Sequence, residues 1–121
     1  MVNRKEIQIM GSTWTIVEGT KEDFPPLSEV DGYTDVSAKL IVVDNLVAAA
    51  NDKFCQSNLT EHKNRVLRHE IIHAFLEECG LNDNSNAVAA WATNEEMVEW
   101  FATQLPKIIA VCAELDILVS K

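Results

Sequence analysis

The sequence predicts an α+β fold, in which a small and mostly antiparallel sheet packs on helices. Apolar and polar residues alternate through much of the first third of the 121-residue chain, and this pattern is typical of half-buried strands. After about residue 57 the apolar residues recur instead at the spacing of one helix face. The length fits a single domain over residues 1–121, and a chain of this size can bury a hydrophobic core.

About three strands are expected in the first third of the chain. Residues 4–19 predict a β-hairpin, because Ile7 and Ile9 alternate with polar neighbours and a Gly-Ser turn separates them from a β-branched and aromatic run. Two consecutive prolines and an Asp-Gly pair make residues 20–32 a loop. A third strand is predicted at about residues 38–43, where an apolar run ends at an Asp-Asn pair.

A long helix is expected to run to about Cys79. Apolar residues such as Val66, Ile72 and Phe75 give it a stripe that can be buried. Gly80 follows at the position where many helices end in a residue with positive φ. Three polar residues can supply the N-cap by accepting a hydrogen bond from the first turn: Ser57, Asn58 or Thr60.

The last helix is expected to begin at Thr93. Thr93 and Glu96 have the spacing of a capping box, in which each side chain accepts a hydrogen bond from the backbone amide of the other. Pro106 lacks a backbone N–H, so we expect a kink or a break there, followed by a final helix to about Val119. Two stretches are expected to be less regular: residues 46–57, as a short helix or an irregular crossing, and residues 81–92, as a polar loop with one helical turn around residues 87–91.

Composition and charge exclude several classes of function. The 10 Lys and Arg residues against 19 Asp and Glu residues give a formal net charge of -9, so binding to a nucleic-acid backbone over a broad face is not expected. No apolar run approaches the roughly 18–20 residues of a membrane span, and the N-terminal residues lack the apolar core of a signal peptide. The three cysteines are widely spaced, with no CxxC pair. We therefore expect a cytoplasmic protein whose cysteines are small buried hydrophobes and whose tryptophans lie in or beside the core.

The chemistry of the chain centres on the segment His69-Glu70-Ile71-Ile72-His73, within the predicted long helix. Residues four apart lie one turn apart on the same helix face, so two imidazoles can converge on one small cation. Neutral imidazole nitrogens suit Zn²⁺, and the glutamate between them can act on a water molecule as a general base. The motif predicts a zinc site with Glu70 as the catalytic residue; the simpler alternative is an amphipathic helix with two solvated histidines.

A catalytic zinc site usually has three protein ligands and a water molecule, so one more ligand is needed. No histidine follows His73, and Cys79 lies about 9 Å further along the helix axis, too far to share the ion. We expect Glu95 to be the third ligand, with Glu96 and Glu99 as the alternatives. With Glu95 on the metal, Glu99 can accept a hydrogen bond from the far nitrogen of a ligand histidine. The simpler reading of these acids is a helix N-terminus favoured by the helix dipole.

Three further residues are candidates for minor roles near this site. Tyr33, the only tyrosine, can assist a developing oxyanion, although a turn or core-edge aromatic is the plainer interpretation. A backbone amide at the edge of the substrate cleft is the other possible oxyanion donor. His62 lies two helical turns before the motif and is expected at its rim. Arg68 is expected to pair with a nearby carboxylate.

The arrangement of these motifs resembles a known class of enzymes. His-Glu-x-x-His followed by Asn94-Glu95-x-x-x-Glu99 on a later helix resembles the gluzincin metallopeptidases, and the small size resembles the minigluzincins. Phe101-Ala102 and Leu105-Pro106, after a strand at residues 40–43, resemble the ImmA/IrrE-type metallopeptidases of phages and mobile elements. The resemblance covers roughly residues 32–106. Glu99 stands where gluzincins usually carry Asp, and the sequence offers no second domain to form the far wall of a cleft.

The resemblance implies a minimal zincin-like domain that holds Zn²⁺ and hydrolyses peptide bonds. In such folds the strand before the active-site helix, here residues 39–43, lines the cleft and pairs with the main chain of the substrate. The implied substrate is a protein or peptide, with a regulatory protein of a phage or mobile element, such as a repressor, as one example. The alternative functions are a non-catalytic interaction domain stabilised by zinc and zinc-dependent hydrolysis of a substrate other than protein.

Overall fold

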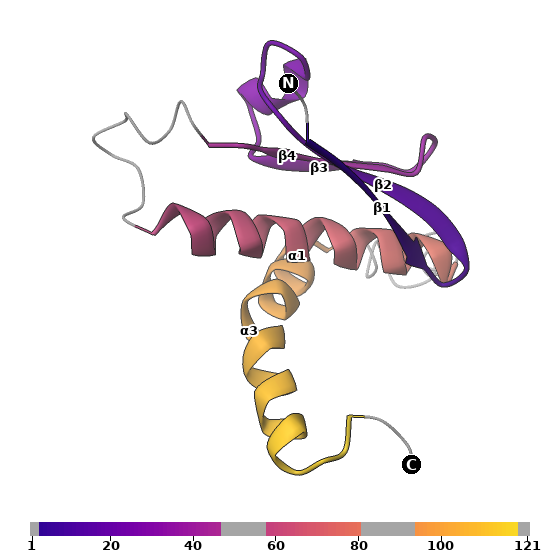
Figure 1. The fold of residues 1–121 in the computed structure, drawn as a ribbon, viewed down its shortest axis with the longest axis vertical. Coiled ribbons are helices and arrows are strands. Elements are labelled where there is room, and N and C mark those ends of the chain that lie inside the picture. Colours follow the sequence, from indigo (N-terminus) through magenta and orange to yellow (C-terminus); the bar gives the residue numbers. More distant parts are fainter. Residues whose placement is uncertain (1–2, 47–57, 81–93, 119–121) are drawn as a thin grey trace.

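The computed structural model describes residues 3–46, 58–80 and 94–118. Within these residues the chain is α+β, as the sequence predicts, with a four-stranded sheet, a short 3-10 helix and two long helices (Figure 1). The elements follow in the order β1 Asn3–Ile9, β2 Ser12–Gly19, η1 Pro25–Ser28, β3 Gly32–Asp35, β4 Leu40–Asp44, α1 Leu59–Glu78 and α3 Glu95–Glu114. Neither long helix combines the length and apolar composition needed to cross a bilayer within these described ranges.

The sheet has the strand order β1-β2-β4-β3 and is mixed. β1 pairs with β2 and β3 pairs with β4 in antiparallel fashion, whereas β2 and β4 are parallel. The expected number of about three strands is therefore wrong: the sequence predicts a loop up to residue 32 and no strand directly after it, whereas residues 32–35 form β3. β3 has only 4 residues, and all of them are half-buried, so it shows none of the alternation that marks a strand in a sequence.

The predicted hairpin over residues 4–19 is confirmed. Ile7 pairs with Trp14 across β1 and β2, and Ile9 pairs with Ser12. The turn consists of Met10 and Gly11, one residue earlier than expected, and both have positive φ (51° and 90°). A two-residue turn whose twist matches that of the strands requires positive φ at both of its residues, and glycine adopts such a φ without strain.

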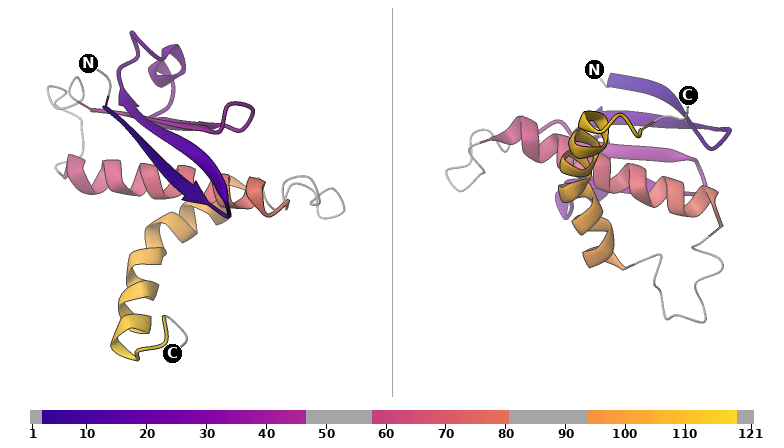
Figure 2. Two further views of the ribbon diagram at one scale, coloured as in Figure 1. Left: turned by 45° about the vertical axis from the view of Figure 1, so that its right-hand side comes forward. Right: turned by 90° about the horizontal axis from the view of Figure 1, so that it is seen from below.

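Helix α1 lies along one face of the sheet, as the first two figures show (Figure 2). Its N-cap is Asn58, whose side chain accepts a hydrogen bond from the amide of Glu61 at 3.1 Å. Its end is followed by Gly80 at φ 82°, as the sequence predicts. The core between helix and sheet includes Trp14, which is fully buried, and Ala74 on α1.

The face of α1 comes unusually close to β3 at one point. A Cβ atom added to Gly32 would lie 2.7 Å from Cγ1 of Val66 and 3.2 Å from the carbonyl oxygen of Val42. Real Cβ atoms essentially never come as close as the first of these distances, so a larger residue at this position would require Val66 or β3 to shift. The glycine therefore lets β3 lie directly beside the His-Glu-x-x-His segment.

Helix α3 crosses the outer face of α1, and its second half extends away from the sheet (Figure 1). Asn94 caps it, accepting a hydrogen bond from the amide of Met97 at 2.9 Å. Thr93 of the predicted capping box lies outside the described residues. Of the kink or break expected at Pro106, the break is wrong, because α3 runs through the proline to Glu114, and the separate final helix to about Val119 is wrong for the same reason.

The structure offers a physical reason why the helix continues through Pro106. A proline removes the amide that would bond the carbonyl four residues earlier, which here belongs to Ala102. Nε of Arg68, from α1, donates a hydrogen bond of 2.7 Å to that carbonyl oxygen. The group that Pro106 leaves without a partner is thus satisfied from the neighbouring helix, and the same contact ties α3 to α1.

Two expectations about the core are wrong. Trp100 is 54% exposed and packs edge-to-face against Phe101, because it lies on the side of α3 that is turned away from α1. Cys79 is exposed at the end of α1. Cys55 and Trp91 lie outside the described residues.

Candidate metal centre

The two histidines of the motif lie side by side on α1. Their ring centroids are 5.0 Å apart, and their side chains are only 14% and 17% exposed, for His69 and His73 respectively. This arrangement follows from the local sequence, because residues four apart in any α-helix are one turn apart on one face. The rings therefore present two nitrogen donors to the same small volume.

Helix α3 brings a carboxylate to both rings. Oε2 of Glu95 lies 2.9 Å from Nε2 of His69, and Oε1 lies 2.9 Å from Nε2 of His73. One donor atom from each of the three residues lies within 4.8 Å of the other two. Ligand atoms of a tetrahedral zinc ion with bonds of about 2.0–2.1 Å are roughly 3.4 Å apart, so this set fits the size and the chemistry of such an ion.

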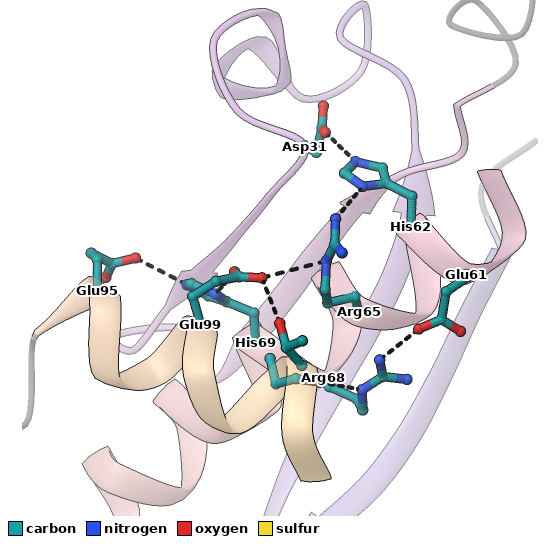
Figure 3. Close-up of polar contacts among 10 residues, drawn as sticks. Asp31, Glu61, His62, Arg65, Arg68, His69, Glu95 and Glu99 are labelled. Carbon is teal, nitrogen blue, oxygen red and sulfur yellow. Dashed lines mark hydrogen bonds and ion pairs between the residues drawn. The ribbon is translucent and has the colours of Figure 1, made fainter. Parts of the chain in front are cut away.

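The other two acids of α3 behave differently. Oε2 of Glu99 lies 2.7 Å from Nδ1 of His69, at the ring nitrogen that points away from Glu95 (Figure 3). A carboxylate at this position fixes the tautomer and the orientation of a ligand histidine. The side chain of Glu96 is exposed and has no hydrogen bond or ion pair within the described part of the chain.

The surroundings of His69 favour its protonated form when no metal competes for the ring. Burial lowers the pKa of His69, but the hydrogen bond to Glu99 and the charges of Glu70 and Glu95 outweigh it, so the pKa of His69 is raised. A metal ion would take the place of that proton at Nε2, while the carboxylate of Glu99 would still accept the hydrogen bond from Nδ1.

Glu70 is the one charged residue that is buried among those the structure describes, with 7% of its surface exposed. Its Oε1 accepts a hydrogen bond of 2.9 Å from the hydroxyl of Thr34 on β3. Burial raises the pKa of Glu70; the hydrogen bond from Thr34 and the neighbouring histidines oppose the rise without cancelling it. A raised pKa makes the ionised carboxylate a stronger base, which suits it to take up a proton.

A cavity of about 330 Å³ opens beside this carboxylate, and it is lined by β3 as well as by Glu70, His73 and Glu95. Tyr33 lines it, so the tyrosine that the sequence singled out lies at the site and belongs to a strand. Burial, and then the charge of Asp35, raise the pKa of Tyr33, which keeps its phenol protonated and able to donate a hydrogen bond.

The strand that the resemblance placed at the cleft is not the one found there. Residues 39–43 correspond to β4, which is paired with β2 on one side and with β3 on the other. No edge of β4 is open to another chain, so its expected role in pairing with a substrate is wrong. β3 is the terminal strand of the described sheet, and it is β3 that lies beside Glu70.

Several residues around the site escaped the sequence reasoning. Thr34 has no signature of its own, and only the β-prone run after the Asp-Gly pair could have marked its strand. Arg65 lies between the carboxylate of Glu99 and the ring of His62, and nothing in the sequence distinguishes it from a solvated arginine. His62 is at the rim, as expected, but it contacts Asp31 at 2.6 Å. Arg68 pairs with Glu61 at 2.8 Å, as expected.

Comparisons of the chain with family models, with curated proteins and with solved structures found no match. The assignment of a function therefore rests on the geometry of the site and on the chemistry of its residues.

Proposed function

We propose that the protein is a zinc-dependent peptidase. In this proposal His69, His73 and Glu95 hold the ion, and Glu70 is the general base. The observation that carries it is the position of one buried carboxylate, that of Glu70, beside a three-residue donor set and beside an edge strand. An acidic group is costly to bury without a partner of opposite charge, and a cation held by the three donors would supply that partner.

The chemistry of the site supports peptide hydrolysis. A zinc ion held there would polarise the scissile carbonyl group and lower the pKa of a water molecule. Glu70 takes the proton from the attacking water molecule and passes it to the amine nitrogen that leaves. Thr34 orients the carboxylate of Glu70 through its hydroxyl group. Tyr33 lines the same cavity, and in this proposal its hydroxyl donates a hydrogen bond to the developing oxyanion.

The strand β3 supports a peptide as the substrate. One of its edges is paired with β4, and the other has no strand partner within residues 3–46, 58–80 and 94–118. An extended peptide can add to such an edge through main-chain hydrogen bonds, which hold the backbone whatever its side chains are. Because Thr34 on this strand contacts Glu70, a peptide bound along β3 would pass the proposed base.

The test compares the wild-type protein with Glu70→Gln, which keeps the shape of the side chain and removes its basicity. Metal analysis of the purified protein should find about one zinc ion per chain, and Glu70→Gln should retain it. Incubation with a library of random peptides, followed by mass spectrometry, should reveal cleavage by the wild type and a loss of about a thousandfold or more in the variant. Glu96→Gln, the same change at an exposed position of α3, is the matched control and should cleave normally.

Two results would contradict the proposal. One is a protein that binds no zinc; the other is cleavage that Glu70→Gln leaves unchanged. A third result, in which zinc raises the melting temperature of the wild type but no peptide is cleaved, would favour the non-catalytic interaction domain.

A further inference from the structure

A second cavity continues from the proposed metal centre toward the start of β3. Its volume is about 380 Å³, and it shares Glu70 and Glu95 with the cavity around Tyr33. Beyond these shared residues it extends to Arg65, about one turn before the histidine motif on α1, and to His62, two turns before it. A peptide that passes Glu70 along β3 would place residues on one side of its scissile bond in this second cavity.

Arg65 is the only lysine or arginine among the described residues that line the two cavities. Apart from the histidine rings, the other charged groups that line the two cavities are carboxylates. Nε of Arg65 lies 3.4 Å from Oε1 of Glu99, and its Nη2 lies 3.3 Å from Nδ1 of His62 (Figure 3). The side chain remains 31% exposed. A guanidinium carries five N–H donors, and these two contacts use only two of them. Nη1 has no hydrogen bond or ion pair within the described part of the chain.

The guanidinium is held in place by a chain of polar contacts. Arginine is always a donor, so Nδ1 of His62 accepts from Arg65, and Nε2 of His62 then carries the proton that it donates to Asp31 over 2.6 Å. The His62 side chain is 15% exposed, which leaves it little freedom. Asp31 through His62 on one side and Glu99 on the other thus fix the plane of the guanidinium, with its Nη1 end uncommitted. A fixed arginine loses little conformational entropy when it binds a ligand.

We propose that Arg65 binds a carboxylate of the peptide substrate, on the side of the scissile bond that lies next to the start of β3. The proposal rests on the proposed peptidase function. A carboxylate can bind end-on through Nη1 and the remaining N–H of Nη2, in the paired geometry that arginine offers to carboxylates. Elsewhere in the cavity Asp31, Glu70 and Glu99 repel an anion, so Arg65 fixes where it can lie. The ligand is either the side chain of an acidic residue or the C-terminal carboxylate of the peptide.

Binding probes test this without requiring catalysis. The probes are three short peptide hydroxamates, which anchor to a zinc ion through the hydroxamate group. One ends in an aspartate amide, one in an asparagine with a free C-terminal carboxylate, and one in an asparagine amide, which is neutral. Isothermal titration of the zinc-loaded full chain should find that one of the two acidic probes binds roughly 10- to 100-fold more tightly than the neutral probe. Preference for the first identifies an acidic side chain, and preference for the second identifies a chain end.

The variant Arg65→Gln should abolish this preference and leave the affinity for the neutral probe nearly unchanged. Lys63→Gln is the matched control: it removes the same charge from the same helix and also breaks one ion pair, with Glu18, but lies outside both cavities. It should retain the preference. The proposal is overturned if the wild type binds all three probes equally or binds none of them. It is also overturned if Arg65→Gln weakens all three to the same extent, since the arginine would then act only through Glu99. A protein that shows the preference but cleaves no peptide would contradict the peptidase function and leave the carboxylate site standing.

Discussion

The contact between Arg68 and the carbonyl of Ala102 can be tested by a double-mutant cycle with Pro106. The first change is Arg68→Met, which keeps much of the apolar stem and removes the donor. The second is Pro106→Ala, which restores the backbone amide that the carbonyl of Ala102 would bond within the helix. Our interpretation of the proline predicts that Arg68→Met lowers the free energy of unfolding much more when residue 106 has no backbone amide.

The structure sets the expected magnitude. Ala102 is fully buried and its carbonyl oxygen accepts the 2.7 Å bond from Arg68, so losing the donor leaves a buried acceptor without a partner, at a cost of about 1–3 kcal/mol. Arg68 also pairs with Glu61, whose side chain is 55% exposed, and such a pair contributes at most about 1 kcal/mol. Arg68→Met should therefore cost about 1–4 kcal/mol in the natural sequence. With alanine at position 106 the cost should fall to that of the ion pair, about 0–1 kcal/mol.

Urea denaturation of the four proteins, followed by circular dichroism, gives the free energies of unfolding for the cycle. Glu61→Gln is the control for the ion pair and should be the mildest single change. Equal costs of Arg68→Met in both backgrounds would refute the reasoning, because the carbonyl would then not depend on the arginine. A cost of Arg68→Met no larger than that of Glu61→Gln would refute it as well.

Two further predictions concern the carboxylates. Glu99→Gln should weaken zinc binding by roughly 10- to 100-fold in a competition titration with a chelator, because His69 loses the acceptor that orients it, whereas Glu96→Gln should leave the affinity unchanged. The hydrogen bond from Lys39, and then those from Trp14 and Ser12, lower the pKa of Glu78 in the folded protein. The ionised carboxylate therefore stabilises the fold fully above the pKa that Glu78 has in the unfolded chain. This stabilisation is lost as the pH falls through the lower pKa of the folded state. The melting temperature of the wild type should therefore decline more steeply from about pH 5 downward than that of Glu78→Gln. Parallel declines of the two proteins would contradict the stabilising role of the ionised Glu78.

Much of the fold follows from local patterns. The hairpin, the strand after residue 38 and the end of α1 before Gly80 were predicted, and Asn58 was one of three candidates for the N-cap of α1, because alternation, turn residues and helix caps are properties of neighbouring residues. The errors arose where distant segments decide. β3 is held by its pairing with β4 and by its contact with α1, and the continuation of α3 through Pro106 accompanies a hydrogen bond from another helix.

The sequence by itself determined the pair of imidazoles and the carboxylate between them, because the geometry of a helix fixes how residues one turn apart are placed. Only the tertiary structure decided which acid of α3 meets those rings and that Thr34 contacts Glu70 from the edge strand. It also decided that Arg65 stands between Glu99 and His62. Glu95 and Thr34 are 26 and 36 residues away in the sequence from the motif residues that they contact. No local rule sets the placement of partners so far apart in the sequence. It depends on how α3 crosses α1 and on how close Gly32 allows β3 to come to the helix.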